Sequence, residues 1–206
     1  MLYFTKTPRW LRLLHPSAVW NMPRDQQKIY LTFDDGPHGG STPFVLEQLR
    51  QYQARATFFC IGKNVLAEPA LYKNILMEGH RVGNHTMEHR NGWKTPDKVY
   101  LDDIEKARTL IDSDLFRPPH GRITPFQADN LVRILKYKLI MWDVLSGDFD
   151  PKVNGAEAAR RVTKYASAGS IVVFHNSAKS FDTLRESLPI VLRHFSDLGY
   201  QFEAIV

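Results

Sequence analysis

The sequence contains a single cysteine, Cys60, among its 206 residues. One cysteine excludes an intrachain disulfide framework and every cysteine-rich zinc or iron–sulfur site, so we expect this thiol to be a small buried hydrophobe. The chain also lacks any run of about 18 apolar residues, which a membrane-spanning helix needs, and we predict no membrane span. Any metal ion must therefore be held by histidine, aspartate or glutamate.

No block of basic residues accompanies the net charge of +5, because the 27 lysines and arginines are interspersed with 22 aspartates and glutamates. We therefore expect no nucleic-acid partner. Apolar residues make up 43% of the chain and charged residues 24%, which is the composition of a globular protein. The length suits one domain, and no repeat or linker divides it. We also predict no obligate protein partner.

The first 27 residues contain no recognisable signal peptide. Lys6, Arg9 and Arg12 interrupt every apolar stretch, so an uninterrupted apolar region of about 7–15 residues is missing. We therefore expect a cytoplasmic protein, with peripheral membrane association and export left open. Residues 1–27 are predicted to pack as an extension on a catalytic domain formed by residues 28–206. Contact with a membrane surface is the alternative, which we favour less because the stretch is short and mixed in character.

Short runs rich in β-branched and aromatic residues alternate with stretches of helical periodicity. The predicted strands are residues 28–34, 56–61, 81–85, 115–117, 138–143, 170–175 and 200–206. This alternation predicts a parallel α/β architecture, and its sheet is expected to be either open and doubly wound or closed into a barrel. In the helix after Pro96, we expect Val99, Ile104 and Ala107 to face the core and Asp103 to face outward.

Residues able to do chemistry follow the carboxyl ends of these predicted strands, where parallel α/β folds place their sites. His85 and His89 are four residues apart, a spacing that suits two imidazole ligands on one ion if the loop turns helical. Asp35 adds a carboxylate, and such a set leaves positions for water and substrate, as in catalytic Zn²⁺ sites. Consecutive side chains diverge in an extended chain, so we expect Asp34 to take a proton while Asp35 binds the metal.

Five ordered segments carry a family resemblance: TFDDGP, HTMEH, RPPHG, the Trp142–Phe149 stretch and VFH. They resemble the motifs of the polysaccharide deacetylases, carbohydrate esterase family 4, over nearly the whole chain from Ile29 onward. The resemblance implies a distorted (β/α)7 barrel in a single α/β domain. It further implies one divalent metal ion, most often Zn²⁺ and sometimes another first-row ion, and hydrolysis of N-acetyl groups on an amino sugar or glycan.

The resemblance also implies a role for each motif residue. The metal ligands would be Asp35, His85 and His89. Asp34 would be the catalytic base and His175 the general acid, which protonates the leaving amine. Arg117 would orient Asp34, and Asp148 would steady Arg117.

On the substrate side, the resemblance implies that the backbone N–H of His120 helps to stabilise the oxyanion. Trp142 and Val173 would wall a small apolar pocket for the acetyl methyl group. Trp93 follows His89 in a loop, and we consider it the best candidate for stacking on a sugar ring.

Several positions depart from the family pattern. Leu145 stands where an aspartate is usual, Phe149 replaces a tryptophan, and Val173 replaces a leucine. His120 stands where the family has tyrosine or phenylalanine, and Asn176 follows the acid where aspartate is usual. Losing that aspartate is expected to lower the pKa of His175 by removing a negative charge.

These departures bear on the substrate more than on the reaction type. Two other readings therefore stay open. One is a hydrolase of small amides or cyclic imides on the same scaffold, and the other is a glycan-binding barrel without catalysis.

Overall fold

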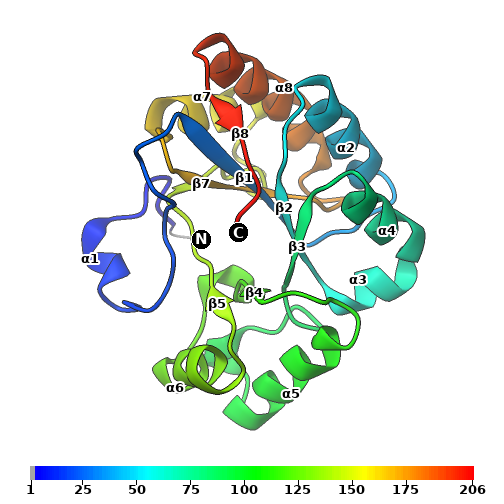
Figure 1. The fold of residues 1–206 in the computed structure, drawn as a ribbon, viewed down its shortest axis with the longest axis vertical. Helices are drawn as coiled ribbons and strands as arrows, with labels where there is room; N and C mark the ends of the chain where they lie inside the picture. The colour runs from blue at the N-terminus through cyan, green and yellow to red at the C-terminus, as the bar shows by residue number, and fades with distance from the viewer. Residues whose placement is uncertain (1–2) are drawn as a thin grey trace.

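The computed structural model describes residues 3–206, in which strands and helices alternate around a curved parallel sheet (Figure 1). The strands are β1 (Lys28–Asp34), β2 (Thr57–Cys60), β3 (Arg81–Asn84), β4 (Leu115–Phe116), β5 (Lys138–Leu139), β6 (Val144–Leu145), β7 (Ile171–His175) and β8 (Gln201–Phe202). Their order in the sheet is β5-β4-β3-β2-β1-β7-β6, with β8 paired to the first residues of β1. Every pairing between these strands is parallel, so their carboxyl ends meet at one rim.

Helices cover the outside of this half-barrel (Figure 1). They are α1 (Arg9–Arg12), α2 (Ser41–Gln51), α3 (Gly62–Ala67), α4 (Pro69–Met77), α5 (Asp97–Arg108), α6 (Pro125–Asp129), α7 (Gly155–Tyr165) and α8 (Phe181–Asp197). Two 3₁₀ turns, η1 (Gly92–Lys94) and η2 (Pro119–Gly121), and the π-helical turn η3 (Asn130–Ile134) complete the elements. None of the helices between residues 3 and 206 has the length and apolar character needed to cross a bilayer.

The core is densest between the central strands. Phe33 on β1 stacks against Phe58 on β2 at 5.1 Å and against Phe174 on β7 at 6.1 Å between ring centroids. All three rings are fully buried, and each contributes roughly 2–3 kcal/mol through its removal from water. Cys60 at the end of β2 is fully buried, as expected, and its burial raises the pKa of the thiol. The packed centre holds the rim of β1 and its neighbours rigid.

The sheet differs from the prediction between residues 138 and 145. One strand was expected over residues 138–143, but β5 ends at Leu139 and β6 begins at Val144. The intervening backbone bonds to the N-terminal segment instead: the Thr7 N–H donates to the Asp143 carbonyl at 2.9 Å. Isolated bridges join Lys6 to Val144 and Val19 to Ile140. The N-terminal segment thus lies along the open edge of the half-barrel, at the left of Figure 1, while the predicted domain boundary at residue 27 stays a prediction.

Candidate active site

The carboxyl-terminal rim of the sheet surrounds a cavity of about 420 Å³. The β1–β7 register places Asp34 directly beside His175. Eight of the eleven predicted site residues line this cavity: Asp34, Asp35, His85, His89, His120, Trp142, Val173 and His175. Arg117 and Asp148 lie buried behind the cavity wall, and Trp93 lines a neighbouring hollow.

Asp35, His85 and His89 bring one ligand atom each to within 4.8 Å of one another. The Oδ1 atom of Asp35 lies 3.1 Å from His89 Nε2 and 3.7 Å from His85 Nε2. This Oδ1 is buried, and within residues 3–206 it has no hydrogen-bond partner of good geometry. A buried carboxylate oxygen facing two imidazole nitrogens can accept a cation.

Electrostatics keep these groups in the protonation states that a metal requires. Burial lowers the pKa of His85 to about 4, so its imidazole is neutral at pH 7. Its Nδ1 lies 2.7 Å from the Arg117 carbonyl and donates to it, which leaves the lone pair on Nε2, toward Asp35. Burial alone would raise the pKa of Asp35, but the close contact of the His89 imidazole and the charge of His175 hold it well below its usual range.

Four residues around the cavity adopt left-handed backbone conformations without being glycine. They are Asp35 (φ 75°), Thr86 (φ 65°), His89 (φ 57°) and His120 (φ 60°). Each such conformation costs free energy and persists only where surrounding contacts hold it, which is typical of functional sites. Two of the three candidate metal ligands are among them, so packing of the loops fixes the directions of these side chains.

Asp103 supplies part of that support, and its predicted outward orientation is wrong. It is 4% exposed, and its Oδ2 accepts from the backbone N–H groups of Met87 and Glu88 at 3.0 Å. Its Oδ1 accepts from Arg90 Nε at 2.9 Å. The buried stripe of α5 is Tyr100, Asp103, Ile104 and Ala107, while Val99 is 43% exposed. That set has the i, i+3, i+4, i+7 spacing of one helix face.

Asp34 is held by a buried arginine. Arg117 Nη1 donates to Asp34 Oδ1 at 2.8 Å and to Thr32 Oγ1 at 2.6 Å. Arg117 is fully buried, and its other nitrogens donate to the carbonyls of Ile140 and Met141. The guanidinium is therefore fixed from several sides and fixes Asp34 in turn. The contact with Thr32 was not anticipated; the alternation of β1, which puts Thr32 and Asp34 on one face, was the available signal.

Asp148 contacts His175, so the expectation that it steadies Arg117 is wrong. Asp148 Oδ1 accepts from His175 Nδ1 at 2.8 Å, and Oδ2 accepts from the His175 backbone N–H at 2.7 Å. Burial lowers the pKa of His175, but the charge and hydrogen bond of Asp148 outweigh that and raise it to about 9. His175 thus has a negatively charged partner although Asn176 stands where the family has aspartate, and the lowering expected from that replacement stays a prediction.

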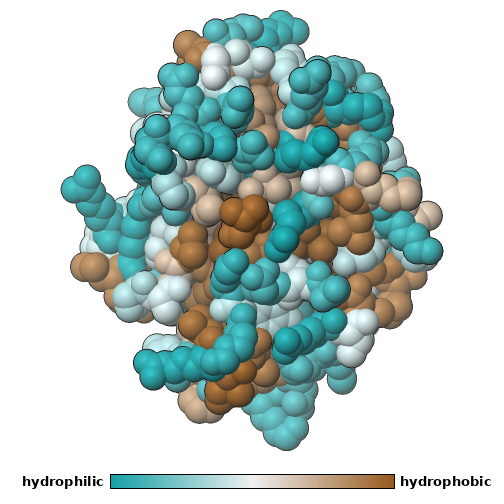
Figure 2. Space-filling model, in the orientation of Figure 1, coloured by the Kyte–Doolittle hydropathy of each residue, from teal (hydrophilic) through white to brown (hydrophobic). Residues whose placement is uncertain are grey.

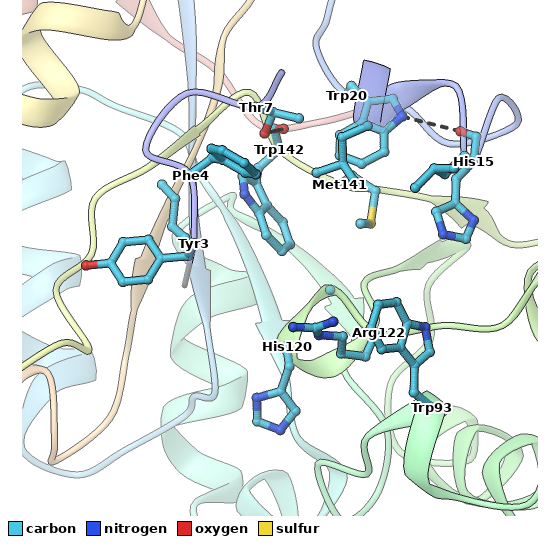
Figure 3. A pocket seen from close by; sticks show the side chains of 14 residues that line it. Tyr3, Phe4, Thr7, His15, Trp20, Trp93, His120, Arg122, Met141 and Trp142 are labelled. Carbon is cyan, nitrogen blue, oxygen red and sulfur yellow. Dashed lines mark hydrogen bonds between the residues drawn. The ribbon is translucent and has the colours of Figure 1, made fainter. Parts of the chain in front are cut away.

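Aromatic rings form part of the remaining wall of the cavity. The Phe149 ring packs edge-on against His175 at 4.9 Å, and the His120 ring packs edge-on against His89 at 4.6 Å. Trp142 lines both this cavity and a neighbouring hollow of about 230 Å³, which Figure 3 shows. Trp93 belongs to that hollow: its Nε1 donates to the Ile123 carbonyl at 2.9 Å, and Arg122 lies 4.0 Å from the centroid of its ring.

Comparison with known proteins decides the family. The polysaccharide deacetylase family model matches residues 21–139. A peptidoglycan-N-acetylglucosamine deacetylase of Bacillus cereus is 34% identical over 197 residues, which cover 91% of this chain and 91% of that protein. This chain belongs to the polysaccharide deacetylase family. The sequence resemblance is confirmed.

Another curated relative and two solved structures support the same family and fold. The peptidoglycan-N-acetylglucosamine deacetylase PgdA of Listeria monocytogenes is 31% identical over 188 residues, 88% of this chain but 39% of that protein. The crystal structure of the Bc1960 peptidoglycan N-acetylglucosamine deacetylase in complex with 4-naphthalen-1-yl-N-oxidanyl-benzamide matches with a TM-score of 0.88. It is 26% identical and covers 97% of this chain and 95% of that one. The peptidoglycan deacetylase PdaC of Bacillus subtilis matches with a TM-score of 0.79 at 28% identity, covering 89% and 90% of the two chains. The predicted barrel is thereby confirmed.

One wall residue of this polysaccharide deacetylase was not anticipated. Tyr3, from the N-terminal segment, lines the cavity and packs against Phe149 at 5.2 Å between ring centroids. Its hydroxyl donates to Asp150 Oδ2 at 2.9 Å and accepts from Arg161 Nη1 at the same distance. No motif or spacing signals this role, because the contact depends on how the N-terminal segment crosses the barrel edge. Four of the five family departures lie in the wall, and they are His120, Leu145, Phe149 and Val173.

Proposed function

We propose that this polysaccharide deacetylase is a metal-dependent hydrolase that removes N-acetyl groups from amino sugars of a glycan. The observation that carries the proposal is the convergence of a three-residue ligand set, a held carboxylate and a cationic histidine on one cavity. Peptidoglycan bearing N-acetylglucosamine is the first substrate to test, because the relatives from Bacillus and Listeria are peptidoglycan deacetylases.

The ligand set fits a divalent ion. One carboxylate and two imidazoles are the donors that catalytic Zn²⁺ accepts, and other first-row ions share this preference. The unpartnered Oδ1 of Asp35 and the neutral His85 are what such an ion needs, and Asp35, His85 and His89 would hold it. When bound, the ion supplies Lewis-acid polarisation of the substrate carbonyl and lowers the pKa of water to about 7.

Asp34 is the general base in this proposal. Arg117 holds its Oδ1, so Oδ2 is the atom that takes a proton from the attacking water. The buried guanidinium also stabilises the negative charge of the carboxylate before the proton arrives. Because Arg117 is bonded on several sides, the carboxylate is presented to the cavity in one orientation.

His175 is the general acid. Its pKa of about 9 means that the ring is protonated at pH 7, and its Nδ1–H is committed to Asp148. The Nε2–H therefore gives its proton to the leaving amine as the C–N bond breaks. The backbone N–H of His120 would donate to the oxyanion, and Trp142 and Val173 would contact the acetyl methyl group from the cavity wall.

Release of acetate tests the proposal. Purified protein loaded with Zn²⁺ should release acetate from peptidoglycan fragments or chitooligosaccharides much faster than from simple acetamides, and it should not open cyclic imides. Turnover only of small amides or imides would favour the small-molecule reading. Inactivity on every substrate, together with a full complement of metal, would favour a glycan-binding barrel. The variant Asp34→Asn serves as the blank for contaminating activity.

A further inference from the structure

The N-terminal segment exposes large apolar side chains although it packs on the barrel. Phe4 is 47% exposed, Trp10 57%, Leu13 77% and Leu14 59%. The Phe4 and Trp10 rings lie edge-on at 6.2 Å between centroids, so they form one surface. Four large apolar side chains exposed within eleven residues are unusual for a surface that faces only water.

Cations are interspersed with these apolar side chains along the segment. Lys6, Arg9, Arg12 and Arg24 line a hollow of about 460 Å³, together with Thr7 and Asn21. Residues 3–24 contain no aspartate or glutamate. Asp143, from the barrel, pairs with Lys6 at 2.6 Å, Arg12 at 2.6 Å and Arg24 at 3.1 Å. Arg9 has no salt bridge to Asp143, so these four cations and one carboxylate leave an excess of three positive charges.

We propose that residues 3–24 form a docking surface for membranes rich in anionic phospholipid. The cations would contact lipid phosphates, and Trp10, Leu13 and Leu14 would enter the boundary between headgroups and acyl chains. An apolar face beside a basic one is what interfacial segments present, and each cation near an anionic surface adds attraction. At the left edge of Figure 2, around α1, hydrophobic and hydrophilic side chains lie next to each other.

The same segment connects this surface to the cavity. Phe4, Leu14 and His15 line the hollow of about 230 Å³ shown in Figure 3, and Trp142 and His120 line it as well. Those two residues also line the candidate active site. Docking would therefore bring the mouth of the cavity close to the membrane surface. The inference rests on exposure and charge, and it does not depend on the proposed reaction.

Vesicle sedimentation tests the docking. The full chain should sediment with vesicles of equal parts phosphatidylglycerol and phosphatidylcholine, but not with phosphatidylcholine alone, and added salt should weaken binding. The variant Trp10→Ser/Leu13→Ser should lose binding. Arg9→Gln should weaken it about fivefold. The matched control is Leu76→Ser/Met77→Ser on α4, at the opposite side in Figure 1, where the side chains are 45% and 76% exposed; it should bind like the parent.

Circular dichroism and thermal unfolding establish that each variant is folded. Absence of sedimentation with the anionic vesicles would overturn the docking, as would equal losses in the control variant. Dimerisation of the parent in light scattering, abolished by Trp10→Ser/Leu13→Ser without any vesicle binding, would assign the surface to a second copy of the chain. Binding to a soluble polyanion without vesicle binding would overturn the lipid assignment in the same way. All of these variants should release acetate from soluble substrates at the rate of the parent, and this expectation holds for any soluble substrate that the parent hydrolyses.

Discussion

Asp148 binds His175 twice, through Nδ1 at 2.8 Å and through the backbone N–H at 2.7 Å. Ser146 Oγ also donates to Asp148 Oδ1 at 2.9 Å, so the carboxylate itself is held in place. Through these two contacts, Asp148 fixes the orientation, the tautomer and the charge of the His175 ring. Asp148, which the resemblance assigned to Arg117, therefore supports His175, the proposed general acid.

Asp148→Asn should move the basic limb of the pH profile of kcat to lower pH. Burial lowers the pKa of His175, and the negative charge of Asp148 raises it to about 9. Without that charge the pKa should fall to or below its ordinary value of 6.5. The acid form would then be lost as pH rises through about 6.5, and kcat at pH 8 should fall more than about tenfold. Asp182→Asn, whose side chain is 92% exposed, is the control. An unmoved basic limb would contradict the assignment.

Removal of one candidate ligand should remove the metal. His89→Ala deletes one of three donors, and we expect the affinity for Zn²⁺ to fall more than about 100-fold, since even a lost outer partner costs 10–100-fold. Element analysis of the purified protein should find one ion per chain in the parent and almost none in the variant. His194→Ala on α8 is the matched control and should keep the ion. Equal metal content in both variants would show that the site lies elsewhere.

The residues that line the cavity could be predicted because parallel strands bring their carboxyl ends together. Asp34 and His175 end neighbouring strands in register, so their positions in the motifs determined their positions in space. The supporting contacts could not be read in the same way. From the sequence, Asp148 could pair with either Arg117 or His175, and only the fold shows that it binds His175.

Periodicity alone also misplaced one helix face. On α5, the face expected to pack on the core combines Val99 with Ile104 and Ala107, but Val99 and Ile104 are five residues apart, about 140° around a helix. The structure buries Tyr100, and Asp103 follows because it is three residues on. The position of Trp93 was equally hard to predict. The sequence places it in a loop after His89, but it does not show that Arg122 and the Ile123 carbonyl hold the ring in the neighbouring hollow.

Asp34→Asn should separate catalysis from folding and metal binding. The amide oxygen can still accept from Arg117 Nη1, but it cannot take a proton. We expect kcat to fall about 10²–10⁴-fold, the usual contribution of a positioned base, with metal content close to the parent. Both substitutions remove the counter-charge of the buried guanidinium, but Asp34→Asn keeps a hydrogen-bond acceptor for it, so Asp34→Ala should lose more stability, about 3–5 kcal/mol. Turnover by Asp34→Asn within tenfold of the parent would disprove the assignment of Asp34 as the general base.

Asp103→Ala should destabilise the loop that carries His89. The substitution removes the acceptor of the Glu88 N–H and of Arg90, and it weakens the bonding of Met87. We expect a loss of about 2–3 kcal/mol in the free energy of unfolding, measured by urea denaturation, because buried donors are left unsatisfied. Asp102→Ala is the matched control on the same helix: that side chain is 54% exposed and pairs with Lys98. Its removal should change stability by less than about 0.5 kcal/mol. Similar losses in the two variants would mean that Asp103 does not support the loop, whereas a selective loss accompanied by weaker Zn²⁺ binding would tie this carboxylate to the geometry of the ligand set.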